Sequence, residues 1–126
     1  MATYKELRVW KESMNLSILI YRITKKFPSD ERRGLTDQMR RASVSIVSNI
    51  AEGYGRLSDG DLLRFLKISL GSAYELDTQV DLSKYLSYID EATYNDLTER
   101  LNVIIKMLLS LIYRRNHGMD SFDVKN

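Results

Sequence analysis

Residues 97–112 read LTERLNVIIKMLLSLI, and this stretch decides the fold class because its apolar residues recur every three or four positions. That spacing indicates an amphipathic α-helix. The side chains on one face are Leu97, Leu101, Ile104, Leu108, Leu111 and Ile112. Further apolar residues at Val103, Met107 and Leu109 leave only a narrow polar strip. The run is shorter than the roughly 20 apolar residues that span a bilayer, so we expect no membrane segment.

The same periodicity recurs three times upstream, and short breaks separate the four segments. We expect helices at about 7–26, 31–53, 58–86 and 91–115. Pro28 stops the first, because proline disfavours helical geometry in the residue before it. Gly53 and Gly55 end the second. Ser58 begins the third, with Asp61 three residues on in a weak capping-box pattern.

Four such helices joined by short turns predict an all-α fold, an antiparallel up-down four-helix bundle formed by residues 1–115 as one domain. The 126 residues are 44% hydrophobic and 29% charged, which is ordinary globular usage rather than disorder. Ser29 and Asp30 are expected to cap the helix at 31–53, with Glu31 at its positive end. Residues 116–126 are expected to be a flexible tail.

The absence of cysteine excludes a disulfide framework and a thiolate metal site. The N-terminus runs straight into charged sequence and has no apolar signal-peptide core. From these features we expect a cytoplasmic protein.

The residues form no catalytic or cofactor-binding constellation. His117 is the sole histidine and follows the last expected helix, so no base is placed to activate a serine. Glu52 and Glu75 could face inward, but the di-metal sites of four-helix bundles also need histidine ligands. We therefore expect no metal, no cofactor and no enzymatic activity.

Basic residues are concentrated in the first half of the chain. The net charge is +2, but eleven basic and six acidic residues up to Ser58 give +5 there and leave −3 for the remainder. Such asymmetry either steers an anion or is neutralised by pairing. The candidates for contacts with nucleic-acid phosphates are Lys25, Lys26, Arg32, Arg33, Arg40 and Arg56. An ordinary solvated surface is the alternative, since Asp37 lies within a helical turn of two of these bases.

Two polar stripes run along the helices at 31–53 and 58–86. Their members recur at steps of three or four residues: Gln38, Arg41, Ser45, Asn49 and Glu52 on the first helix, and Ser72, Glu75 and Gln79 on the second. Buried polar groups need hydrogen-bond partners, so the two stripes are expected to satisfy each other. One interpretation is a functional site with Arg41 paired to Glu75. The other is a network that fixes helix register or a subunit contact.

The helices at 7–26 and 91–115 carry apolar residues on more than one face. The first has two apolar rows: Leu7, Trp10, Met14, Ile18 and Tyr21, and beside them Val9, Leu16, Ile20, Ile23 and Phe27. A lone small bundle would expose part of these faces, and contiguous exposed apolar patches usually mark an interface. We therefore expect a homo-oligomer.

Four segments resemble those of a known family. The stretch LTDQMRRASVSIVSNIAEG (35–53) is similar to the first signature of the 23S rRNA intervening-sequence proteins, and FLKISLGSAYEL (65–76) is similar to their second. LRVW (7–10) and KFP (26–28) fit as well, so the resemblance covers nearly the whole chain. The matching signature positions are Gln38, Arg41, Asn49, Glu52, Gly71, Ser72 and Glu75.

Such proteins are encoded within inserted segments of bacterial ribosomal RNA genes or elsewhere, and no enzymatic activity is attached to them. The resemblance implies a bundle that assembles into a ring-like homo-oligomer, with a pentamer expected. The fold is similar to the accessory protein of diversity-generating retroelements, which binds nucleic acid and a reverse transcriptase. Val47 replaces a frequent proline of the family, and Leu70 replaces a common basic residue.

The leading hypothesis is a non-catalytic, ring-forming bundle that associates with RNA or DNA through basic side chains. Weak, salt-sensitive and sequence-independent binding is what phosphate contacts would give. The alternative is a protein-interaction scaffold with no nucleic-acid role.

Overall fold

The computed structural model describes residues 3–117, and within them the chain forms four long α-helices and no β-strand. The helices are α1 (Arg8–Thr24), α2 (Leu35–Tyr54), α3 (Asp59–Tyr85) and α4 (Glu91–Asn116). Two single-turn 3-10 helices, η1 (Tyr4–Glu6) and η2 (Ser29–Glu31), precede α1 and α2. The prediction of an all-helical fold with four helices is confirmed. No helix in this described part of the chain has both the length and the apolar character to span a bilayer.

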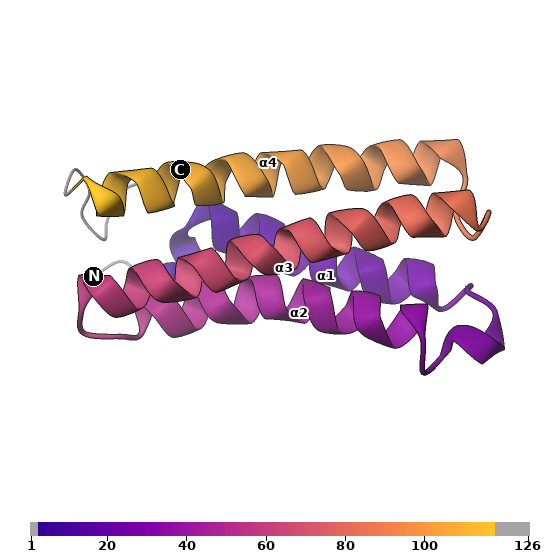
Figure 1. The fold of residues 1–126 in the computed structure, drawn as a ribbon, viewed down its shortest axis with the longest axis horizontal. Helices are drawn as coiled ribbons and strands as arrows, with labels where there is room; N and C mark the ends of the chain where they lie inside the picture. Colours follow the sequence, from indigo (N-terminus) through magenta and orange to yellow (C-terminus); the bar gives the residue numbers. More distant parts are fainter. Residues whose placement is uncertain (1–2, 118–126) are drawn as a thin grey trace.

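The four helices lie along the long axis of the molecule (Figure 1). Each helix packs against two others: α2 contacts α1 and α3, and α4 contacts α3 and α1. Among these contacts, α2 with α3 is the most extensive and α1 with α4 the least. Helices adjacent in the chain are thus adjacent in space, which is the arrangement of a four-helix bundle with short connections.

The second helix begins at Leu35, not at about residue 31 as the sequence predicts. The chain first turns through η2 and Gly34, whose backbone angles of φ −109° and ψ −115° lie outside the helical region. Ser29 and Asp30 lie in η2 and do not cap α2, so that prediction is also wrong. The Glu31 carboxylate caps α2 from outside the helix, because its Oε1 accepts the Leu35 N–H at 3.0 Å.

Local sequence fixes both ends of α3. Ser58 is its N-cap, with its Oγ accepting the Asp61 N–H at 3.1 Å, as the sequence predicts. At the other end Ser87 takes a left-handed φ of 63°, a conformation that most helix ends leave to glycine. The chain then turns back so that the Tyr88 N–H donates to the Ser83 carbonyl oxygen at 2.9 Å. This turn places Tyr88 in the connection between α3 and α4.

The last helix continues into the predicted tail. Asn116 is its final residue, and His117 packs against the last turn. The His117 Nδ1 lies 2.8 Å from the Tyr113 carbonyl oxygen, and the two rings stack with their centroids 4.1 Å apart. The first two residues of the predicted tail therefore belong to the helix end. The remainder, residues 118–126, lies outside the described residues.

The apolar face predicted within residues 97–112 forms one wall of the core. All six of its side chains are at most 9% exposed. Facing them are fully buried side chains from the other three helices: Leu16, Ile20, Met39, Ile46, Ile50, Leu66 and Leu76. Burial of each large aliphatic side chain stabilises the fold by about 1.5–3 kcal/mol, so this shared core is the main force that holds the four helices together.

The outward apolar residues are distributed more widely than predicted. On α1 the row with Leu16 and Ile20 faces the core, whereas Ile18 and Tyr21 are 43% and 41% exposed. On α4 Leu109 is 45% exposed. The structure also exposes an apolar group on α3 that the sequence analysis missed: Ile68, Tyr74, Leu82 and Tyr85.

Candidate nucleic-acid interface

Four of the six candidate basic residues lie where α1 connects to α2, at one end of the molecule (Figure 1). Lys25 and Lys26 follow the end of α1, and Arg32 and Arg33 follow η2. All four residues are exposed. None of them forms an ion pair with any residue from 3 to 117. We refer to these four residues as the basic cluster.

Two acidic residues, Asp30 and Glu31, lie in the same connection. Both carboxylate oxygens of Glu31 are engaged, since Oε1 accepts the Leu35 N–H and Oε2 accepts the Tyr88 hydroxyl at 2.8 Å. The hydrogen bond from Leu35, followed by the one from Tyr88, holds the pKa of the Glu31 carboxyl below its usual value. Glu31 is therefore ionised at neutral pH. Asp90, before α4, is a third acid near the cluster, because hydrogen bonds from Thr93 and, to a lesser extent, the charge of Lys26 lower its pKa. The four bases still exceed these three acids.

Arg40 points across to α1. Its Nε donates to Thr24 Oγ1 at 2.9 Å, and its Nη2 donates to the Tyr21 carbonyl oxygen at 3.3 Å. The guanidinium also lies over the Tyr21 ring, 4.6 Å from the ring centroid. Arg40 therefore links α2 to α1 beside the basic cluster, and its Nε and Nη2 are engaged with the fold while its Nη1 forms no hydrogen bond with a described residue.

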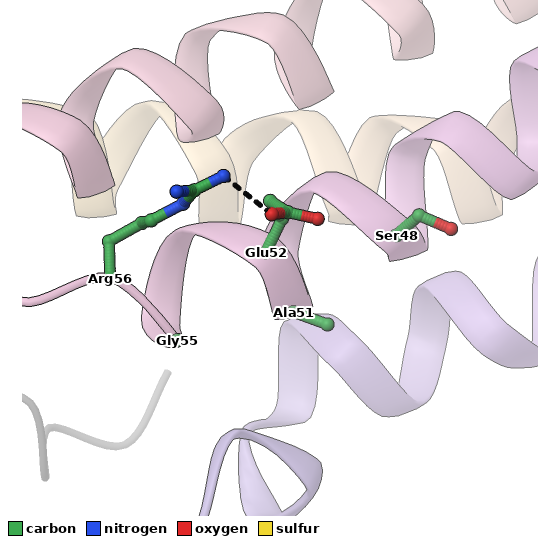
Figure 2. A pocket seen from close by; sticks show the side chains of 5 residues that line it. All are labelled: Ser48, Ala51, Glu52, Gly55 and Arg56. Carbon is green, nitrogen blue, oxygen red and sulfur yellow. Dashed lines mark hydrogen bonds and ion pairs between the residues drawn. The ribbon is translucent and has the colours of Figure 1, made fainter.

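Arg56 lies beyond the opposite end of α2. The helix has 20 residues, so its ends are about 30 Å apart at 1.5 Å per residue. The Arg56 Nη2 contacts Glu52 Oε2 at 2.6 Å, as Figure 2 shows, and the guanidinium lies 4.8 Å from the centroid of the Phe65 ring. An open depression beside this pair is lined by Ser48 and Gly55. Arg56 is thus separate from the basic cluster and engaged within its own surroundings.

The polar stripes of α2 and α3 meet along the contact between these helices. Ser45 Oγ and Ser72 Oγ are 2.7 Å apart. The Asn49 side-chain amide donates to the carbonyl and hydroxyl oxygens of Ser45 at 2.8 and 3.0 Å. Deeper in the contact, Ser69 Oγ donates to the Ile46 carbonyl oxygen at 2.8 Å. These hydrogen bonds join particular turns of the two helices and so fix their register.

Arg41 and Glu75, which one of the two interpretations of the polar stripes pairs in a functional site, form no hydrogen bond or ion pair with each other. The Arg41 Nε lies 2.9 Å from Asp37 Oδ2, one turn earlier on the same helix. Glu75 accepts a long hydrogen bond of 3.4 Å from Gln79 Nε2. The predicted pairing is wrong because Arg41 reaches a partner within one helical turn. Gln38, like Arg41, is exposed.

Two glycines of the signature segments lie in different surroundings. A Cβ at Gly53 would lie 3.0 Å from Phe65 Cβ and 3.1 Å from Leu62 Cδ1, so α2 and α3 approach closely at this point. A Cβ at Gly71 would meet no atom of the described residues within 4 Å. Glycine costs a helix interior roughly 1 kcal/mol relative to alanine, and packing within the described chain does not account for that cost at Gly71.

Gly71 belongs to an outward row on α3. Ile68, Glu75 and Leu82 follow one another at intervals of seven residues, or about two helical turns, so they share a side of the helix with Gly71. Ile68 and Leu82 are 42% and 45% exposed. We refer to these four residues as the outer stripe.

Carboxylates do not gather into a metal site in the described part of the chain. Within residues 3–117, no three His, Asp or Glu side chains lie close enough to hold a metal ion. The two glutamates considered as inward ligands are both exposed, Glu52 beside Arg56 and Glu75 beside Gln79.

Sequence reasoning missed two residues at the α1–α2 end. Tyr88 reaches Glu31 from the connection between α3 and α4, and no local pattern marks such a long-range partner. Thr24 is buried at the end of α1, where its Oγ1 donates to the Ile20 carbonyl oxygen at 2.7 Å and accepts from Arg40. Its position four residues after Ile20, on the core row of α1, is the signal that could have found it.

Comparison with known proteins identifies a family whose model matches most of this chain. Residues 5–110 match the family described as 23S rRNA-intervening sequence protein. A crystal structure from Bacteroides thetaiotaomicron, described as a protein with unknown function from the S23 ribosomal protein family, is similar, with a TM-score of 0.78 and 25% sequence identity. The similarity covers 83% of this chain and 95% of that chain. No match to a curated protein was found.

Proposed function

The chain belongs to the 23S rRNA-intervening sequence protein family, and from this premise we propose that it is a non-catalytic homo-oligomer that associates with RNA or DNA in the cytoplasm. The basic cluster supplies the contacts with nucleic-acid phosphates. The observation that carries the proposal is that these four bases are exposed and free of ion pairs within the described chain.

Phosphate contacts of this kind bind without regard to sequence. Each neutralised phosphate releases condensed counterions, so affinity falls steeply as salt rises. Four contacts per subunit give a slope of log K against log salt of about −3 for a single strand. One subunit alone binds weakly, and several subunits on one strand bind much more tightly through their effective concentration.

A second copy of the chain is the occupant that we propose for the outer stripe, in a ring for which five subunits are expected. Exposed Ile68 and Leu82 provide apolar surface for such a contact. The open space at Gly71 leaves room for another helix to approach the backbone of α3. This assembly brings several copies of the basic cluster into one particle.

The nucleic-acid proposal is tested by fluorescence anisotropy with labelled RNA and DNA over a range of salt concentrations. In the cluster variant Lys25→Gln, Lys26→Gln and Arg33→Gln are combined, and the salt slope is expected to fall by about 2 units. The matched control combines Lys5→Gln, Lys11→Gln and Lys106→Gln, which removes three exposed bases without ion pairs elsewhere on the chain. Equal losses in both variants, or no binding by the unaltered protein at ~50 mM salt, would reject the proposal.

The proposed subunit contact is tested by sedimentation velocity. Leu82→Lys places a charge on the outer stripe, and we expect it to shift the oligomer toward monomers. Leu109→Lys is the matched control, because Leu82 and Leu109 are both 45% exposed but lie on different helices. Dissociation by Leu109→Lys alone would place the contact on α4 instead. A monomeric unaltered protein at micromolar concentration would remove the proposed oligomer altogether.

A protein-interaction scaffold is the second candidate function. The observation in its favour is the exposed apolar group on α3, because such a surface binds a different protein as readily as a second copy of the chain. Affinity capture after nuclease treatment separates the two functions. A scaffold retains its partners and binds no nucleic acid, whereas the function proposed first loses partners that were held through RNA or DNA.

A further inference from the structure

A small cavity lies between the end of α1, η2 and the first turn of α2. Its volume is about 190 Å³. Its polar lining consists of three bases and three hydroxyl residues: Lys25, Arg32, Arg40, Thr24, Ser29 and Thr36. No carboxylate lines it. Sites for drug-sized molecules measure about 300–1,000 Å³, so this cavity suits one small anion rather than a whole nucleotide.

Thr36 offers the cavity an unused hydroxyl. The residue is only 6% exposed, and its hydroxyl forms no hydrogen bond with any residue that the structure describes. The hydroxyl oxygen itself is open to solvent, so a ligand oxygen can take the place of water as the acceptor of its proton. Thr36 is the second residue of α2, where the positive end of the helix favours an anion. Gly34 has no side chain to cap this end, and Glu31 takes only the Leu35 N–H.

Arg40 gives the cavity a guanidinium whose position is already fixed. Its Nε and Nη2 are held by Thr24 and Tyr21, while its Nη1 forms no hydrogen bond within residues 3–117. A side chain that is held before binding loses little conformational freedom when the ligand arrives. The planar guanidinium also matches the geometry of phosphate oxygens. Lys25 and Arg32 complete the positive wall from the exposed side.

We propose that this cavity binds a single phosphate group, with Arg40, Arg32 and Lys25 as its cationic partners and the Thr36 hydroxyl as a donor. This inference rests on the proposed function, because a nucleic acid would supply that group either as an internal phosphodiester or as a 5′-terminal phosphate. The cavity thereby fixes one phosphate at a defined place, while Lys26 and Arg33 act on neighbouring phosphates by charge alone.

The direct test is a titration of the full chain with inorganic phosphate, followed through backbone amide signals by NMR. Sodium chloride at the same ionic strength is the reference. We expect phosphate to shift the amide signals of Thr36 and Asp37 to saturation, and chloride to leave them nearly unchanged. Shifts of equal size in both salts would overturn the proposal.

Matched variants separate the cavity from general positive charge. Arg32→Gln removes a base that lines the cavity, and Arg33→Gln removes its neighbour, which does not. Arg32→Gln is expected to weaken phosphate binding about tenfold or more, and Arg33→Gln less than about twofold. Thr36→Val is expected to weaken it as well without lowering the melting temperature of the free protein, because the hydroxyl has no partner to lose. Equal effects of Arg32→Gln and Arg33→Gln would overturn the proposal.

Nucleic-acid measurements distinguish a failure of the cavity from a failure of the proposed function. If RNA binding persists while Arg32→Gln and Arg33→Gln act alike, the cavity is rejected and the function stands. If phosphate binding depends on Arg32 but no RNA or DNA binds, the function is rejected and the cavity stands.

Oligonucleotides of one sequence with a 5′-phosphate or a 5′-hydroxyl identify which phosphate of the nucleic acid occupies the cavity. A preference for the former that Arg32→Gln abolishes assigns the terminal phosphate, and equal binding that Arg32→Gln weakens assigns an internal one.

Discussion

The contact between α2 and α3 and the basic cluster use polar side chains in opposite ways. In the contact, serine hydroxyls of α3 meet a hydroxyl and a carbonyl oxygen of α2, and the charged side chains beside them pair within one helical turn. In the basic cluster, four charges stay in solvent and form no ion pair in the described chain, although Lys26 is close enough to Asp90 to act on it electrostatically. The first arrangement stabilises one fold, and the second keeps charge available for a ligand. Substitutions should therefore change stability in the first region and binding in the second.

The largest expected effect on stability comes from a substitution in the core beneath the contact between α2 and α3. Ile46 is fully buried, and its carbonyl oxygen accepts the Ser69 hydroxyl. Ile46→Ala should lower the free energy of unfolding by about 2–5 kcal/mol, because it removes buried methyl groups and leaves a cavity. Urea denaturation at one fixed protein concentration measures the change. Val44→Ala, two residues away and 39% exposed, is the control and should change it far less. Similar losses in both would show that Ile46 is not packed as described.

The second effect concerns the two adjacent arginines of α2. Arg40→Gln should lower the free energy of unfolding by about 1–3 kcal/mol, since it removes charge-assisted hydrogen bonds to α1. Arg41→Gln should change it by less than about 0.5 kcal/mol, because the Arg41 side chain is 79% exposed and its ion pair with Asp37 is screened by water. Thermal and urea denaturation that rank these two arginines in the reverse order would contradict the roles assigned to them.

A third prediction isolates the hydrogen bond between Ser45 and Ser72. A double-mutant cycle with Ser45→Ala and Ser72→Ala should give a coupling of about 0.5–1.5 kcal/mol, the net value of one hydrogen bond in a partly buried place. Binding of RNA by all three variants should match that of the unaltered protein. Strictly additive losses of stability would mean that the two hydroxyls do not interact.

The smallest expected effect is a pH dependence of stability that arises from Glu31, which lies beside the basic cluster and caps α2. Because the folded pKa of Glu31 lies below its ordinary value of 4.5, its ionised form adds stability above that value. This contribution is lost as the pH falls through the folded pKa. The melting temperature of Glu31→Gln should therefore be lower than that of the unaltered protein at pH 6, and the gap should close on acidification below about 4.5. A gap that is the same at pH 6 and pH 3 would contradict this.

The sequence predicts well those parts of the fold in which apolar residues recur at every helical turn and are buried. The core face within residues 97–112 is recognisable because one side of a helix buries the same kind of residue turn after turn. For α1 periodicity offers two rows, and small hydroxyl residues decide between them. Ser17 lies on the buried side and its Oγ is 3.1 Å from Ser43 Oγ, so α1 turns this side toward α2.

The parts that the sequence does not predict depend on contacts outside the local pattern. The sequence predicts the start of α2 too early, because the residue that caps it, Glu31, belongs to a separate turn and is held by the distant Tyr88. The pairing of Arg41 with Glu75 failed because Asp37 competes from the same helix. The sequence does not predict the small cavity, because Thr24 and Thr36 are 12 positions apart and only the folded turn between α1 and α2 brings them together. Only the tertiary structure shows which charges remain free.

The link from Tyr88 through Glu31 to the Leu35 N–H joins two connections that are far apart in the sequence. The exchange of this one amide hydrogen with solvent therefore reports on the docking of the α3–α4 connection as well as on the fraying of α2. A partner that lifts Tyr88 away would loosen the first turn of α2 without touching it. Protection of Leu35 in deuterium exchange is thus a measure of communication between the two halves of the chain.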